Sequence, residues 1–257
     1  MFPLKDDLPA HRRPIITVAL IISCVLVFLW QTQLDAHAGF VAVHIYGFIP
    51  AELFGDGVLP ADITVVPPAA TLLTSMFLHG GLMHLGGNML YLWVFGRNVE
   101  DSLGHVRFLI FYVLCGIAAA FAQAFPDPES AIPMIGASGA ISGVLGAYLI
   151  LFPHARVHVI IPFGFMFLHT VRAGWLLAFW FVYQLLSGLI DQGEGGVAWW
   201  AHVGGFVAGM ALVFVMRDRR RKLWPHRSTR TRLSPRRKNR GRSYMPRVSR
   251  RRPGPWG

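Results

Sequence analysis

Charged residues are scarce in this chain. Of its 257 residues, 14% are Asp, Glu, Lys or Arg and 54% are hydrophobic, whereas an average soluble domain has about 25% charged residues. Six stretches of at least 18 residues contain no charged residue: 14–34, 63–96, 108–126, 130–155, 173–190 and 195–216. This pattern argues against a soluble globular domain and indicates a chain that crosses a membrane several times.

Cysteine is also rare, with Cys24 and Cys115 as the only two in the sequence. Both lie in charge-free stretches without a neighbouring metal-ligand residue, so we interpret them as small apolar residues of the interior. The sequence therefore predicts no disulfide framework. It also lacks the His-Glu-x-x-His pattern of zinc proteases, which leaves that class of enzyme without support.

Each charge-free stretch can supply a spanning helix, which needs about 20 mostly apolar residues. In lipid the backbone must satisfy its own hydrogen bonds, and these stretches lack the alternation of half-buried strands. We therefore predict an all-α polytopic membrane protein, a bundle of six transmembrane helices within residues 15–216. A cytoplasmic segment, 1–14, precedes the bundle, and a basic tail, 217–257, follows it.

Basic residues between the stretches predict the orientation. Lys and Arg occur in the N-terminal segment, in the second and fourth connections and in the tail. The first, third and fifth connections contain acidic residues and no basic ones. By the positive-inside rule, both termini are cytoplasmic and the odd-numbered connections face outward.

Two segments leave an alternative open. Residues 15–30 could be a cleaved signal peptide, but they exceed the usual apolar region of one and end in Trp30, so we favour an uncleaved first span. Residues 157–171 are apolar and could form a seventh span, yet they are short and interrupted by Pro162 and Gly164. Because a seventh span would also move the basic tail outside, we interpret 157–171 as a segment at the cytoplasmic interface.

Four polar side chains interrupt the apolar stretches near their outer ends. His84 and Asn88 lie early in the second span, Ser138 early in the fourth and His202 early in the sixth. All three spans run from outside to inside, so at 1.5 Å per residue these side chains share one depth, roughly 5–10 Å below the outer surface. Polar side chains inside membrane segments are costly and therefore indicate a functional site.

These residue types are those of acyl transfer. Ser138 would be the nucleophile and His202 the general base. His84 and Asn88, which share one helix face, would donate hydrogen bonds to the oxyanion. No acidic residue lies at this depth of any span, which favours a Ser–His dyad over a triad. The structural alternatives are a hydrogen bond between His84 and Asn88 and a histidine that only packs in the core.

Small residues surround the candidate pair on both of its helices. They are Gly136, Gly139 and Gly143 near Ser138, and Gly205 and Gly209 near His202. Stripes of small residues let helix backbones approach closely in membranes. The stripe has a purely structural interpretation, but close packing of the two helices would also bring the serine and the histidine together.

Four motifs now stand in order along the chain: on the second span, directly after it, on the fourth span and on the sixth. They are His84-x3-Asn88, Gly96-x2-Val99-Glu100-x3-Gly104, Gly136-Ala137-Ser138-Gly139 and Ala201-His202-x2-Gly205-x3-Gly209. In this order and on these sides of the membrane they resemble the rhomboid family of intramembrane serine proteases, over about residues 15–216.

The resemblance implies Ser138 as nucleophile, His202 as base, and His84, Asn88 and the Ser138 backbone N–H as oxyanion donors. It implies a compact six-helix bundle and no metal or organic cofactor. It also implies an irregular first outer loop in the membrane surface, which residues 40–54 suit.

Two positions depart from the family. Some relatives carry an aromatic residue one turn after the serine, where it packs under the histidine ring, and here that position is Ser142. Some also have a Trp-Arg pair in the first outer loop, where this chain has no Arg. The departures leave open what orients His202 and what anchors that loop.

The resemblance also implies partners. Substrates would be transmembrane helices of other membrane proteins, which approach through the lipid bilayer near spans two and five and unwind into an outward-opening site. Apart from the resemblance, a compact six-span chain without a targeting presequence fits a bacterial inner membrane best. The main alternative is a non-proteolytic rhomboid-like scaffold or chaperone; a transporter is less favoured, since the spans contain no acidic residue. The tail holds 17 of the 24 basic residues, which favours contact with anionic lipid over nucleic acid.

Overall fold

Helices account for most of the described chain, as the charge-free stretches predict. The computed structural model describes residues 2–9, 12–57, 59–60, 63–163, 165–191 and 196–217. Its longer helices are α1 (Ile15–Gln31), α2 (Ala36–Tyr46), α5 (Leu82–Tyr91), α7 (His105–Ala124), α8 (Ser138–Leu151), α9 (Ala173–Ile190) and α10 (Trp199–Met216). Short helices are α3 (Pro50–Phe54), α4 (Pro68–Thr74), the 3₁₀ turn η1 (Ser75–Phe77), the π-helical segment η2 (Leu92–Gly96) and α6 (Arg97–Leu103). Apart from Arg217, the predicted basic tail lies outside the described residues.

Three of the described helices are long and apolar enough to cross a membrane by themselves, namely α7, α9 and α10. The apolar helices α1 and α8 are shorter, with 17 and 14 residues. Helix α5 continues without a break through η2 into α6, from residue 82 to residue 103. The predominantly helical membrane fold is therefore confirmed, whereas the count of six spans stays a prediction.

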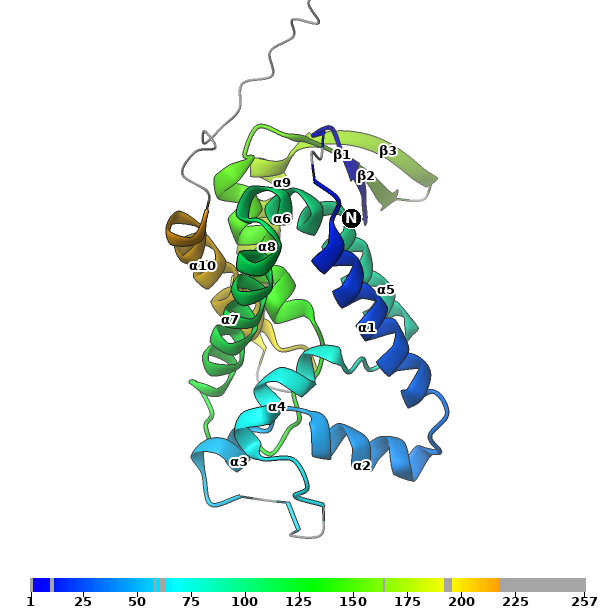
Figure 1. The fold of residues 1–257 in the computed structure, drawn as a ribbon, viewed down its shortest axis with the longest axis vertical. Coiled ribbons are helices and arrows are strands. Elements are labelled where there is room, and N and C mark those ends of the chain that lie inside the picture. The colour runs from blue at the N-terminus through cyan, green and yellow to red at the C-terminus, as the bar shows by residue number, and fades with distance from the viewer. Residues whose placement is uncertain are drawn as a thin grey trace, which may run out of the picture. The chain divides into compact units, whose positions relative to one another are not determined.

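Helix α8 lies against both α7 and α10 (Figure 1), and glycines make these contacts close. A Cβ added to Gly205 would overlap the carbonyl oxygen of Gly139, and one added to Gly209 would overlap the carbonyl oxygen of Gly143. The other face of Gly143 meets the Sγ of Cys115 in α7. With no side chain between them, the backbones of α8 and α10 touch, as the stripe of small residues predicts.

A three-stranded antiparallel sheet, β1–β2–β3, corrects the all-α prediction (Figure 1). Strand β2 (Arg156–Phe163) pairs with β3 (Phe165–Arg172) and with β1 (Phe2–Asp6). The segment interpreted as interfacial is thus a hairpin, and the N-terminal segment supplies its third strand. The physical reason is a local period of two: Val157 and Val159 are fully buried while His158 between them is half-exposed.

The end of β1 is held by a buried carboxylate. Asp6 accepts hydrogen bonds from Tyr148 Oη at 2.6 Å and from Asn98 Nδ2, and it pairs with Arg97 Nη2 at 3.2 Å. Burial raises the pKa of the Asp6 carboxyl, although the hydrogen bond from Tyr148 and the charge of Arg97 act in the opposite direction. These bonds tie the N-terminal strand to α6 and α8.

A second carboxylate joins α1 to the start of α7. Glu100 is 1% exposed, and it accepts hydrogen bonds from the backbone N–H groups of Ile16 and Thr17 at 2.9 and 2.8 Å. The Thr17 hydroxyl and His105 Nδ1 complete its shell, each at 2.6 Å. Glu100 therefore caps the otherwise open N-terminus of α1, where a negative charge is favoured.

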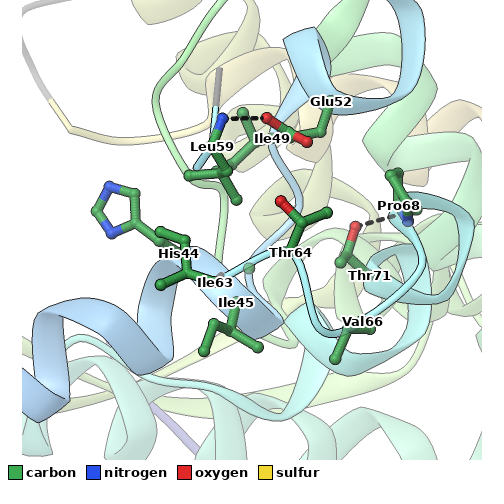
Figure 2. A pocket seen from close by; sticks show the side chains of 11 residues that line it. His44, Ile45, Ile49, Glu52, Leu59, Ile63, Thr64, Val66, Pro68 and Thr71 are labelled. Atoms are coloured by element: carbon green, nitrogen blue, oxygen red, sulfur yellow. Dashed lines mark hydrogen bonds between the residues drawn. The ribbon is translucent and has the colours of Figure 1, made fainter. Parts of the chain in front are cut away.

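The connection after α1 is more regular than predicted. Residues 40–54, expected to be an irregular loop, lie mostly in α2 and α3, which are separated at Gly47. Asp35 caps α2 by accepting from Ala38 N at 2.8 Å, and Pro50 starts α3, where its missing N–H costs no bond. Figure 2 shows the small hollow beside these helices, where Glu52 Oε1 accepts from Leu59 N at 2.6 Å.

Candidate active site

A glycine turn delivers Ser138 to the first residue of α8. Gly136 has φ of +120°, a backbone conformation that side chains disfavour, and its N–H donates to the Ser75 carbonyl at 2.8 Å. The turn is thereby fixed to the segment that precedes α5. Because Ser138 begins the helix, its own N–H has no intrahelical partner and lies at the positive end of the α8 dipole.

Ser138 lies within hydrogen-bond reach of His202, 64 residues later in the chain. The distance from Ser138 Oγ to His202 Nε2 is 2.8 Å, within the range expected of a nucleophile and its general base. The glycine contacts between α8 and α10 account for this approach, since Gly205 lies one turn after His202. The structure therefore brings together the two residues predicted as the dyad.

The second ring nitrogen of His202 contacts helix α9, not α8. Its Nδ1 lies 2.7 Å from Gln184 Oε1, and the ring centroid lies 6.0 Å from that of Trp180. Ser142 takes no part in this arrangement, because its hydroxyl donates to the Ser138 carbonyl at 2.7 Å. Gln184 was not among the predicted site residues. The available signal was an amide side chain in the middle of a charge-free span.

His84 and Asn88 converge on the turn before Ser138. A Cβ built on Gly136 would lie 2.7 Å from His84 Nε2 and 3.8 Å from Asn88 Nδ2. The Gly80 backbone N–H donates to His84 Nδ1 at 3.3 Å, so in the neutral ring Nε2 carries the proton and is a donor. Asn88 Nδ2 is buried and has no hydrogen-bond partner in the part of the chain that the structure describes. Two donors are thus directed to the same place.

A cavity of about 960 Å³ joins these groups. Its lining includes all four predicted polar residues, and it extends to residues of the connections before α8 and before α10. It shares none of the residues that line the hollow of Figure 2. A chamber of this size accommodates several residues of an extended peptide, with Ser138, His84 and Asn88 at its wall.

Comparison with known proteins matches the part of the chain that contains this site. A family model described as the Rhomboid domain matches residues 68–219. Among curated proteins, the "Rhomboid protease GluP" of Bacillus subtilis is 36% identical over 148 residues, which cover 55% of this chain and 25% of the relative. The "Rhomboid protein 1, mitochondrial" of Saccharomyces cerevisiae is 34% identical over 150 residues, covering 54% and 40%.

A plant relative gives a similar match. The "RHOMBOID-like protein 5" of Arabidopsis thaliana is 30% identical over 145 residues, covering 56% of this chain and 43% of the relative. The chain thus spans less than half of the length of each of these relatives. Mitochondrial and bacterial proteins both occur among them, so the comparisons do not favour a bacterial membrane.

Proposed function

Because this chain belongs to the rhomboid family, an integral membrane family whose members include a named protease, we propose that it is an intramembrane serine endopeptidase. In this proposal Ser138 is the nucleophile and His202 the general base. The observation that carries the proposal is the 2.8 Å contact between Ser138 Oγ and His202 Nε2 on the wall of a large cavity.

The first half of the reaction uses the Ser–His contact. Ser138 Oγ attacks the scissile carbonyl carbon while its proton passes to His202 Nε2. The electron pair of the carbonyl moves to oxygen, and the resulting oxyanion accepts hydrogen bonds from His84 Nε2–H, the Asn88 amide and the Ser138 backbone N–H. The oxyanion then collapses to a carbonyl as the scissile C–N bond breaks, the imidazolium gives its proton to the leaving amine, and an ester remains on Ser138.

The second half reverses these roles. A water molecule loses a proton to His202 Nε2 and attacks the ester carbonyl, and the same donors stabilise the second oxyanion. Collapse releases the carboxylate product and restores the Ser138 hydroxyl. Asn88 supports this scheme: its Nδ2 is buried without a partner among the described residues, and such a donor is available to a charge that appears only during the reaction.

We further infer that six spans cross the membrane, formed by α1, by α5 with η2 and α6, and by α7, α8, α9 and α10. Both termini would then be cytoplasmic and the cavity would open to the outer face. Substrates would be transmembrane helices that unwind at a helix-breaking residue, because an intact helix hides its carbonyls in internal hydrogen bonds. The basic tail would contact anionic lipid, and the bacterial inner membrane remains our prediction for the location.

A non-proteolytic rhomboid-like scaffold on the same fold is the alternative function. A scaffold needs neither a nucleophile nor a base, whereas this chain retains both residues at hydrogen-bond distance. The intact pair therefore favours the protease.

Cleavage of a model transmembrane substrate by the purified protein in liposomes tests the proposal and has the largest expected effect. Ser138→Ala should abolish cleavage, because no other nucleophile replaces Oγ. Ser187→Ala, a matched change in α9 away from the cavity, should cleave like the wild type. A fluorophosphonate probe should label the wild type and fail to label His202→Ala. Retained turnover in Ser138→Ala would falsify the assignment of the nucleophile.

A further inference from the structure

Gln184 is a buried amide on a helix whose residues are mostly half-exposed or exposed. Most of α9 is half-exposed or exposed, but Gln184 is 5% exposed and lies on the side that faces α10. One turn later, Gly188 lies against Trp199 and Trp200, where an added Cβ would be 3.2 Å from Trp199 Cβ. This glycine lets the outer end of α9 approach the start of α10, which carries His202.

The contact of Gln184 selects one protonation state of the neutral imidazole. Its Oε1 lies 2.7 Å from His202 Nδ1, and a carbonyl oxygen is only an acceptor, so Nδ1 must carry the proton. The other nitrogen, Nε2, is then unprotonated and faces Ser138 Oγ at 2.8 Å. This tautomer is the one that can receive the serine proton.

Trp180 adds a second constraint from the same helix. It precedes Gln184 by four residues and therefore shares its face of α9, and its ring lies 6.0 Å from the His202 ring at an angle of 40°. The ring of His202 is thus contacted by a hydrogen-bond acceptor and by an aromatic side chain of a single helix. Ser142 offers no aromatic ring to pack under His202. In this chain the contacts with the His202 ring come from α9 instead.

We propose that Gln184 is a positioning residue for catalysis, which holds the His202 ring in the tautomer and orientation that accept the Ser138 proton. The inference rests on the proposed protease function. Gln184 does not touch the substrate or the reacting atoms; it acts through Nδ1 of His202, in the place that an acidic residue occupies in a triad. The competing interpretation is an amide that only fills the contact between α9 and α10.

Two substitutions of similar length separate these interpretations. Gln184→Met removes the acceptor and keeps the volume, so kcat should fall about tenfold, the equivalent of one lost hydrogen bond, while KM stays within about twofold. Gln184→Glu keeps a carboxyl oxygen near Nδ1, so it should recover kcat to within about threefold of the wild type. Gln33→Met makes the same chemical change at an exposed residue and should leave both constants unchanged.

The experiment uses the full chain in liposomes with one transmembrane substrate and a second readout that needs no substrate. The rate of Ser138 labelling by a fluorophosphonate should fall in Gln184→Met by the same factor as kcat and recover in Gln184→Glu. For Gln184→Glu, the acid limb of the kcat/KM profile should also move to higher pH, since a carboxylate stabilises the imidazolium.

Each result either supports the proposal or overturns it. Wild-type kcat in Gln184→Met, or an equal loss in Gln184→Met and Gln184→Glu, overturns the positioning role. A higher KM and a lower thermal stability with kcat unchanged would indicate that Gln184 only packs between α9 and α10. That result overturns the positioning role as well. Failure of the protease function itself is distinguishable, because then the wild type and Ser138→Ala would not differ.

Discussion

Buried polar side chains gather in two regions of this apolar molecule, and their hydrogen bonds differ. Near the sheet, every oxygen of the Asp6 and Glu100 carboxylates accepts at least one hydrogen bond. At the cavity, the Asn88 amide is buried without a partner in the described part of the chain, and the Nε2 donor of His84 points to the turn at Gly136. In the first region the carboxylate oxygens are all paired within the protein, whereas the second contains a donor without a partner among the described residues.

Burying a polar group without a partner costs about 1–3 kcal/mol, so a fold retains such a group only where something else uses it. Satisfied carboxylates join helix and strand ends and contribute to stability. Unpaired donors on a cavity wall contribute to the stability of a bound charge. Substitutions in the two regions should therefore separate stability from activity, and three experiments test that separation.

Asn88→Ala should have the largest effect of the three. Loss of an oxyanion donor lowers kcat about 10²–10³-fold. The folded protein should be no less stable, because Asn88 Nδ2 has no hydrogen-bond partner to lose in the described part of the chain. Cleavage kinetics test the expected loss of kcat, and thermal unfolding in detergent tests the unchanged stability. Strong destabilisation by Asn88→Ala would instead indicate that Asn88 has a structural role like that of Asp6 and Glu100.

Glu100→Ala should show the opposite pattern. It removes the cap of α1 and leaves His105 without its partner, so the free energy of unfolding should fall by about 3 kcal/mol. The activity per folded molecule should stay close to that of the wild type. Glu129→Ala, an exposed carboxylate, is the matched control and should change neither property. Unchanged stability in Glu100→Ala would contradict the structural role.

The smallest effect concerns the pH dependence at Asp6. Its pKa is raised in the folded protein above its usual value of about 3.9, so its contribution to stability is fully present below that value and is lost as pH rises through the raised pKa. As pH rises from below about 3.9 through the raised pKa of Asp6, the unfolding temperature of the wild type should therefore fall relative to that of Asp6→Asn. If the unfolding temperatures of the two proteins changed with pH in parallel, burial would not be the dominant influence on the pKa of Asp6.

The position of each polar side chain along its own helix could be predicted from the sequence. The helical period and the position of the charge-free stretches put His84, Asn88, Ser138 and His202 at one depth, and the glycine stripe indicated which helices approach. The structure places Ser138 Oγ 2.8 Å from His202 Nε2, while the shared depth and the catalytic roles stay predictions. The two strands at residues 157–171 were not foreseen, because an apolar run of that length does not by itself distinguish a strand from a helix.

Two contacts between distant segments could not be predicted in this way. The pairing of β1 with β2 joins residues more than 150 positions apart, and Gln184 meets His202 because Gly188 lets α9 approach α10. The sequence by itself determined which segments prefer lipid and which polar groups they carry, since transfer from water and helix geometry are local properties. Only the tertiary structure decided which of those groups touch, because a hydrogen bond depends on the relative placement of two helices to within a fraction of an ångström.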